Sequence, residues 1–228
     1  MKNHLKRLAA PRNWRIDRKS QKYIVRPKPG PHPLSLSLPL GIIIRDSFKI
    51  AETMREVKIL LKNKTVLVDG KKREEYRLPV GLFDVISLPE IKENYRIVLD
   101  TKGNVSVKKI EPEEASIKPC KIVGKKTLKQ KIQLNLHDGK NILVDKEFKC
   151  KIGDSVLITL PENKIKSLLE LKKDAIVYLI KGKHGGDVGT LKEIKNQLAT
   201  YQKEEKEIET SKDYLFVIGE KKSVIKMD

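Results

Sequence analysis

Residues 53–73 read TMREVKILLKNKTVLVDGKKR, and this stretch predicts a helix followed by a two-stranded hairpin. Thr53 and Glu56 have the spacing of a capping box, in which the two side chains satisfy free backbone N–H groups at a helix start. Apolar residues then recur at helical spacing: Met54, Val57, Leu60 and Leu61. Residues 65–68 read as a strand, and Asp69-Gly70 is a strong signal for a tight hairpin turn.

Working outward, the flanking residues extend this unit into a small α+β module. Upstream, apolar positions recur at helical spacing and predict a first short helix: Leu40, Ile43, Ile44, Phe48 and Ala51. Downstream, residues 81–88 read as a loop entering a strand, and residues 95–99 and 105–107 as a strand pair. Pro112 and its neighbouring acids indicate a boundary.

Beyond that boundary the pattern is of short strands and turns. Strands are predicted at 130–136, 141–144 and 155–160, which indicates a small all-β unit. A last module has strands at 175–180 and 190–194 around the glycine-rich loop 182–189, and residues 217–219 and 224–225 are expected to supply closing strands.

Positive charge is the strongest compositional signal. The 228 residues include 49 Lys+Arg against 30 Asp+Glu, a formal net charge of +19. Residues 1–30 hold ten basic residues and one acid, or +9, and prolines interrupt them, so we expect an extended basic arm that is poorly ordered until it binds a polyanion. Trp14 within it is interpreted in two ways: as a base-stacking residue or as the centre of a small local core.

The residues that several classes of protein require are missing from this sequence. Cys120 and Cys150 are expected to be reduced and buried, since no second cysteine or histidine cluster supplies zinc ligands, and His137 is expected to be a turn residue. Sequence motifs of nucleotide-binding loops, metalloproteases and serine hydrolases do not occur, so we expect no enzyme activity. With no long apolar run or signal peptide, the protein is expected to be cytosolic, without membrane contact.

Three stretches closely resemble the archaeal and eukaryotic small-subunit ribosomal protein family S four e. They are HLKRLAAP at residues 4–11 with Trp14 and Gly30-Pro31-His32, then the run 38–88 with its VDGK (68–71) and PVGLFDVIS (79–87) motifs, and the glycine loop 182–189, which resembles a KOW motif, with Phe216–Gly219. The matches keep the family order, and the short C-terminus is more similar to archaeal members.

The resemblance implies a multi-domain α+β protein: a basic N-terminal extension (1–38), an S-four-type RNA-binding α+β module (39–111), a central β domain (112–172) and a C-terminal SH3-like KOW β-barrel (173–228). It implies a structural constituent of the small ribosomal subunit, in the cytoplasm, that binds ribosomal RNA and neighbouring ribosomal proteins and supports subunit assembly and translation. Neither cofactor, metal nor small-molecule substrate is expected. The alternatives are an RNA-modifying enzyme and a KOW-type transcription factor built on the same modules.

The RNA contacts are expected from basic residues, with one tryptophan and one histidine, in three regions. In the arm they are Lys6, Arg7, Arg12, Trp14, Arg15, Arg18, Lys19, Lys22 and Arg26. In the helix–hairpin module they are Arg45, Lys49, Arg55, Lys58, Lys62, Lys64, Lys71, Lys72 and Arg73. In the glycine loop they are Lys181, Lys183 and His184, where closely approaching backbone amides are also expected to contact RNA.

Overall fold

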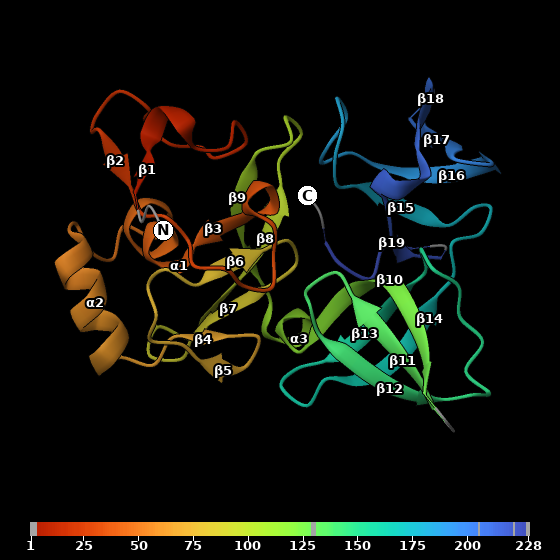
Figure 1. Ribbon diagram of the computed structural model, residues 1–228, viewed down its shortest axis with the longest axis horizontal. Coiled ribbons are helices and arrows are strands. Elements are labelled where there is room, and N and C mark those ends of the chain that lie inside the picture. Colours follow the sequence, from red (N-terminus) through yellow and green to blue (C-terminus); the bar gives the residue numbers. More distant parts are fainter. Residues whose placement is uncertain (1–3, 129–130, 205, 221, 227–228) are drawn as a thin grey trace. The chain divides into compact units, whose positions relative to one another are not determined.

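The computed structural model describes residues 4–128, 131–204, 206–220 and 222–226. The chain divides into two compact units: unit 1 contains Met1–Val98 and Asn104–Ala115, and unit 2 contains Leu99–Gly103 and Ser116–Asp228. Strands dominate, and the helices are few and short (Figure 1). This composition agrees with the predicted α+β class at the level of its secondary structure. The finer division into four segments stays a prediction.

The N-terminal segment of unit 1 is folded onto the rest of the unit. Its elements are β1 (Leu5–Lys6), the 3-10 turn η1 (Arg7–Ala9), β2 (Tyr23–Ile24), paired with β1, and the 3-10 turn η2 (Leu34–Leu36). Ala10, Trp14 and Ile24 are buried, and Trp14 forms a β-bridge with Val105. The expectation of an extended arm is therefore wrong for this segment, because three apolar side chains have a local core to join.

The helices of unit 1 lie in the sequence between two short paired strands, β3 (Ser37–Pro39) and β6 (Pro79–Gly81). The first predicted helix is present as α1 (Leu40–Ile42) and the π-helical turn η3 (Ile43–Ser47), and it ends before Ala51. Lys49 has a left-handed φ of 54°, which a continuing helix does not allow. The second predicted helix is α2 (Met54–Asn63), and both hydrogen bonds of the Thr53–Glu56 capping box are formed.

An antiparallel five-stranded sheet completes unit 1, in the order β5-β4-β7-β8-β9. Its strands are β4 (Leu67–Val68), β5 (Lys71–Lys72), β7 (Val85–Leu88), β8 (Glu93–Leu99) and β9 (Val105–Ile110). The predicted turn is confirmed: Asp69 and Gly70 both have positive φ, 51° and 74°, as a two-residue hairpin loop requires. A helical turn, α3 (Pro112–Ala115), follows the sheet.

Unit 2 contains a first five-stranded antiparallel sheet in the order β12-β11-β10-β13-β14. Its strands are β10 (Ile117–Leu128), β11 (Lys131–Leu136), β12 (Asn141–Asp145), β13 (Ser155–Thr159) and β14 (Lys164–Leu169). The predicted strand 130–136 corresponds to β11, with Gln130 outside the described residues. The long strand β10 and the strand β14 are additional to the prediction. The two cysteines are free and buried in the core of this sheet, as expected.

The second sheet of unit 2 has the order β18-β17-β16-β15-β19. Its strands are β15 (Ile176–Leu179), β16 (Val188–Lys195), β17 (Leu198–Lys203), β18 (Lys206–Ser211) and β19 (Leu215–Gly219), with a 3-10 turn η4 (Lys212–Tyr214) before β19. Residues 224–225 form no strand, so that prediction is wrong; β17 and β18 complete the sheet instead. No helix in the described part of the chain has the length and apolar character needed to cross a membrane.

Candidate nucleic-acid interface

Helix α2 presents three cations on one exposed side. Arg55, Lys58 and Lys62 are exposed, while Val57 and Leu61 on the adjoining face are fully buried. The spacing i, i+3, i+7 brings the three cations onto neighbouring turns of one helix face. The Lys58 ammonium also lies 4.7 Å from the centre of the Tyr76 ring. A fixed row of cations of this kind is suited to a phosphate backbone.

The hairpin β4–β5 carries the next group of predicted cations. Lys71, Lys72 and Arg73 are all exposed and follow the turn directly. Lys72 pairs with Glu74 at 3.1 Å, and Lys64, at the end of α2, pairs with Glu90 at 3.0 Å. Both pairs are solvent-exposed, and exposed ion pairs contribute little free energy, so an RNA phosphate can displace either carboxylate at small cost.

Arg45 and Lys49 differ in their surroundings. The Arg45 guanidinium is half-buried and makes two hydrogen bonds to the carboxylate of Asp46, one from Nε at 2.5 Å and one from Nη2 at 3.0 Å. Its charge is therefore partly compensated within the chain. Lys49 is exposed at the left-handed position where the helical turn ends.

Three of the predicted arm residues hold the N-terminal segment together. Trp14 is 2 % exposed, and its Nε1 donates to the carbonyl of Leu34 at 3.2 Å. Arg7 is 6 % exposed and donates to the carbonyl of Asp17 at 2.7 Å. Arg18 donates to three carbonyls, those of Arg7, Ala10 and Pro11. This burial favours the local-core interpretation of Trp14, and we leave Arg7 and Trp14 out of the proposed RNA surface.

The other predicted arm residues are exposed on unit 1: Lys6, Arg12, Arg15, Lys19, Lys22 and Arg26. Lys22 lies over the exposed ring of Tyr23, with its ammonium 5.5 Å from the ring centre. Lys2, which was counted in the charge of the arm, lies outside the described residues. The available cations of this segment are therefore attached to a folded scaffold, which lowers the ordering cost of binding.

The backbone amides of the glycine loop are already used inside unit 2. Gly185 donates to the carbonyl of Gly182, Gly186 to Leu179 and Asp187 to His184. Gly186 has a φ of +94°, and a Cβ placed on it would lie 1.9 Å from the carbonyl oxygen of Asp100. The glycines thus allow the loop to approach the 99–103 backbone closely, and the expectation that these three amides contact RNA is wrong because each has a partner.

The side chains predicted in this loop remain accessible. Lys181 and Lys183 are exposed, and His184 is half-exposed with its Nδ1 3.4 Å from the carboxylate of Asp187. Asp187 also accepts a hydrogen bond from Lys203 at 2.7 Å. The loop therefore combines a rigid backbone with two outward-directed lysines.

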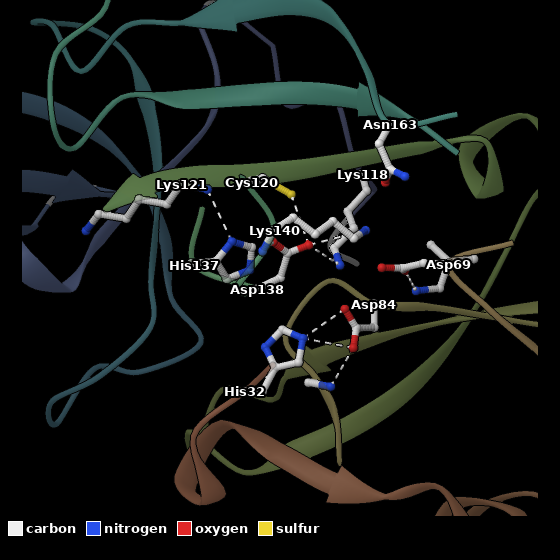
Figure 2. Close-up of polar contacts among 12 residues, drawn as sticks. His32, Asp69, Asp84, Lys118, Cys120, Lys121, His137, Asp138, Lys140 and Asn163 are labelled. Atoms are coloured by element: carbon white, nitrogen blue, oxygen red, sulfur yellow. Dashed lines mark hydrogen bonds and ion pairs between the residues drawn. The ribbon is translucent and has the colours of Figure 1, made fainter. Parts of the chain in front are cut away.

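Two of the sequence motifs in unit 1 meet at a buried contact. His32, 7 % exposed, has its Nε2 3.0 Å from one carboxylate oxygen of Asp84, and the other oxygen accepts a hydrogen bond from the N–H of Gly81 at 2.8 Å (Figure 2). A Cβ on Gly81 would lie 2.2 Å from the His32 ring. The glycine is thus required by the imidazole that packs on it.

A polar cluster in unit 2 gathers around Asp138. Sγ of Cys120, a ring nitrogen of His137 and a carboxylate oxygen of Asp138 lie within 4.8 Å of one another, a set of atoms with metal-binding chemistry (Figure 2). The Lys118 ammonium lies 2.9 Å from the same carboxylate and is fully buried. A lysine cation therefore already compensates the acid, and we assign no metal to the cluster.

The pKa of Asp138 reflects these neighbours. Burial by itself raises the pKa of the carboxyl, but the positive charges of Lys118, His137 and Lys140 and the hydrogen bond from Lys118 outweigh it, and hold the pKa well below its usual range. Sequence reasoning assigned His137 to a turn and gave Lys118 and Asp138 no role. The available signal was Lys118 itself, a charge in the otherwise apolar run Ile117–Cys120.

Comparison with known proteins gives two family-model matches. The model described as Ribosomal family S4e matches residues 91–165, and the model described as RS4NT (NUC023) domain matches residues 1–35. The second match covers the N-terminal segment packed around Trp14, and the first covers the strands from β8 to the start of β14.

Individual relatives match over nearly the full length. The chain is 44 % identical to "Small ribosomal subunit protein eS4" of Methanocaldococcus jannaschii, covering 99 % of this chain and 98 % of that protein, and 46 % identical to the protein of the same name from Nanoarchaeum equitans, covering 85 % and 83 %. The crystal structure of the 30S ribosomal protein S4e from Thermoplasma acidophilum superposes with a TM-score of 0.69 at 32 % identity, over 81 % of this chain and 94 % of that one. The chain therefore belongs to the ribosomal protein family S4e.

Proposed function

We propose that this protein is a structural constituent of the small ribosomal subunit that binds ribosomal RNA and supports subunit assembly and translation. The single observation that carries the proposal is the 44 % identity over 99 % of the chain to a relative named as a small ribosomal subunit protein. The formal net charge of +19 supports it, because a polyanion is the partner that neutralises such an excess. The protein acts in the cytoplasm, as part of the ribosome.

The proposed RNA surface of unit 1 consists of the exposed cations of α2, the hairpin β4–β5 and the N-terminal segment. Capping, burial of Val57 and Leu61 and the tight turn at Asp69-Gly70 fix the first two elements before RNA arrives. Preorganisation reduces the entropy lost on binding, so each phosphate contact contributes more to the affinity. In unit 2 the proposed contacts are Lys181, Lys183 and His184.

The proposed domain organisation keeps the four parts: extension (1–38), RNA-binding module (39–111), central β domain (112–172) and KOW-type SH3-like barrel (173–228). The strand order β18-β17-β16-β15-β19 and the glycine loop between β15 and β16 support the last assignment. We propose that the role involves no catalysis and that its partners are small-subunit ribosomal RNA and neighbouring ribosomal proteins.

Sedimentation tests the proposed function directly. The tagged protein, expressed in an archaeal host, is expected to co-sediment with small subunits in a sucrose gradient and to stay bound at 100 mM salt. Purified protein is expected to bind archaeal small-subunit ribosomal RNA with an affinity that falls on the order of 10³-fold or more between 50 and 200 mM salt if six or more phosphates are contacted. A protein found only at the top of the gradient, with RNA polymerase or alone, would favour the transcription-factor alternative instead.

A further inference from the structure

Unit 2 contains a cavity of about 610 Å³ that no pattern in the sequence predicts. It lies between the segment that joins β12 to β13, the residues Lys125 of β10 and Ile132 of β11, and the residues that follow β14. Figure 1 shows these elements. Its volume is within the range of about 300–1,000 Å³ found for sites that hold small ligands. None of the predicted RNA-contacting residues lines it.

The lining of the cavity is strongly positive. Five lysines contribute to it: Lys125, Lys146, Lys149, Lys151 and Lys172. The two acids that also line it are Asp154 and Glu170. Asp154 is buried, and its carboxylate accepts hydrogen bonds from the backbone N–H groups of Lys151 at 2.7 Å and Leu171 at 2.9 Å. This acid therefore shapes the cavity by holding the backbone at Lys151 and Leu171, and together with Glu170 it still leaves the five lysines in excess.

Three of the lysines are available to a ligand. Lys125 donates to the carbonyl of Cys150, and Lys172 is paired with Glu220 at 3.0 Å. Lys146, Lys149 and Lys151 are exposed, and within the described ranges of the chain they form no ion pair with a carboxylate. Residues 146–151 hold these three lysines against one acid, Glu147, which does not line the cavity, so the excess positive charge favours an anion among the lysines.

Between the lysines the cavity has an apolar floor. Ile132, Phe148 and Leu171 line it, and all three are only half-buried, so part of each side chain faces the cavity. An aromatic ring beside unpaired cations is the combination that holds an unstacked base together with its phosphates. An inorganic anion would need only the lysines and would leave the apolar floor in contact with water.

We propose that this cavity binds one unpaired nucleotide of RNA, with the base against Phe148 and the adjoining phosphates on Lys146, Lys149 and Lys151. The inference rests on the proposed function and adds a site to it in the central β domain, where the positive charge is thinly spread along the sequence. The nucleotide comes from a single-stranded loop or bulge, because a base in a duplex is stacked and cannot enter a cavity.

The test uses the full chain and two variants of equal charge. In the cavity variant Lys146, Lys149 and Lys151 are replaced by alanine; in the control variant the exposed lysines Lys166, Lys206 and Lys222, which do not line the cavity, are replaced in the same way. A third variant, Phe148→Leu, keeps an apolar side chain and removes the ring. Thermal unfolding establishes that each variant is folded before binding is measured.

The probes are archaeal small-subunit ribosomal RNA and a single-stranded hexanucleotide carrying one 4-thiouridine. The cavity variant is expected to lower the slope of log affinity against log salt for the hexanucleotide by about 2, from about 0.7 for each of three phosphate contacts. Phe148→Leu is expected to weaken binding about fivefold or more through lost stacking. Irradiation is expected to crosslink the thiouridine to the peptide that contains residues 146–151.

The outcomes separate this inference from the proposed function. If the parent binds ribosomal RNA and the cavity variant behaves like the control variant, with no crosslink at 146–151, the cavity is not an RNA site while the proposed function stands. If free uridine monophosphate binds the parent as tightly as the hexanucleotide does, the ligand is a free nucleotide and the inference is overturned. If the parent binds no RNA at all, both are overturned.

Discussion

The Lys118 ammonium lies 2.9 Å from a carboxylate oxygen of Asp138, and the two side chains are 0 % and 1 % exposed. Charges so deeply buried are costly to desolvate, and the pair is tolerated because the carboxylate also has Lys140 at 3.4 Å and a backbone N–H to accept from at 3.2 Å. The pair joins β10, the middle strand of the first sheet of unit 2, to the turn between β11 and β12. Removing one partner of the pair is therefore expected to lower the stability of the fold.

Lys118→Met is expected to destabilise the protein by about 3–5 kcal/mol, because it leaves a buried carboxylate without its main partner. The double variant Lys118→Met, Asp138→Asn is expected to recover most of this loss, since asparagine keeps the hydrogen-bond acceptor and removes the charge. Urea unfolding of the parent, the single and the double variant measures the difference. Equal stability of the single and double variants would mean that the pair carries no such coupling.

Stability is expected to fall in acid partly through Asp138. The pKa of this carboxyl in the folded protein is well below its value in the unfolded chain, so the charge stabilises the fold above pH ~4. That contribution is lost as the pH falls from about 5 toward and below 3, because the unfolded chain takes up the proton first. The double variant lacks the carboxyl, so its free energy of unfolding should decline less steeply over this interval; parallel curves would contradict the assignment.

Gly81→Ala is expected to destabilise unit 1 by about 1–3 kcal/mol, through overpacking against the imidazole of His32. The matched control is Gly124→Ala on β10, where the nearest atom to the new Cβ, Nδ2 of Asn135, is 3.5 Å away. The control should stay within about 1 kcal/mol of the parent. Thermal unfolding compares the two; a harmless Gly81→Ala would show that the His32 ring can move aside.

Replacing Arg55, Lys58 and Lys62 by glutamine is expected to weaken binding to ribosomal RNA without unfolding α2. Glutamine has a good helix propensity and adds no acid to the last turn of the helix. The salt slope of the affinity should fall by about 0.7–0.9 for each phosphate contact removed. Leu61→Asp, at a fully buried position, serves as the unfolding control; a folded triple variant with an unchanged slope would exclude this face.

Substitutions of the glycines and of the lysines in the glycine loop are expected to have separate effects, the first on stability and the second on RNA binding. Gly186→Ala is expected to lower the melting temperature, because its φ of +94° and the carbonyl of Asp100 leave no room for a Cβ. Lys181→Ala with Lys183→Ala should leave the melting temperature unchanged and weaken RNA binding, since both side chains are exposed. Binding equal to that of the parent in the lysine variant would restrict the loop to a structural role.

Some of this structure was determined by short stretches of sequence. The capping box at Thr53 and the turn at Asp69-Gly70 depend on contacts between residues at most four positions apart, so the sequence predicts them and the structure contains both. The order of the motifs along the chain was also enough to identify the family, and the relatives confirm this identification.

The tertiary structure alone decided how distant residues meet. Trp14 is buried because Leu34 and Val105 are brought to it, and the cavity lysines come from positions 125 to 172 because β10, β11 and β14 belong to one sheet. Strand β18 was overlooked since three of its six residues, Lys206, Glu207 and Glu209, are charged and the segment resembles a solvated loop. Its partner β17 was overlooked with it. Long-range pairing depends on the free energy of the whole core, and no short window of sequence contains that information.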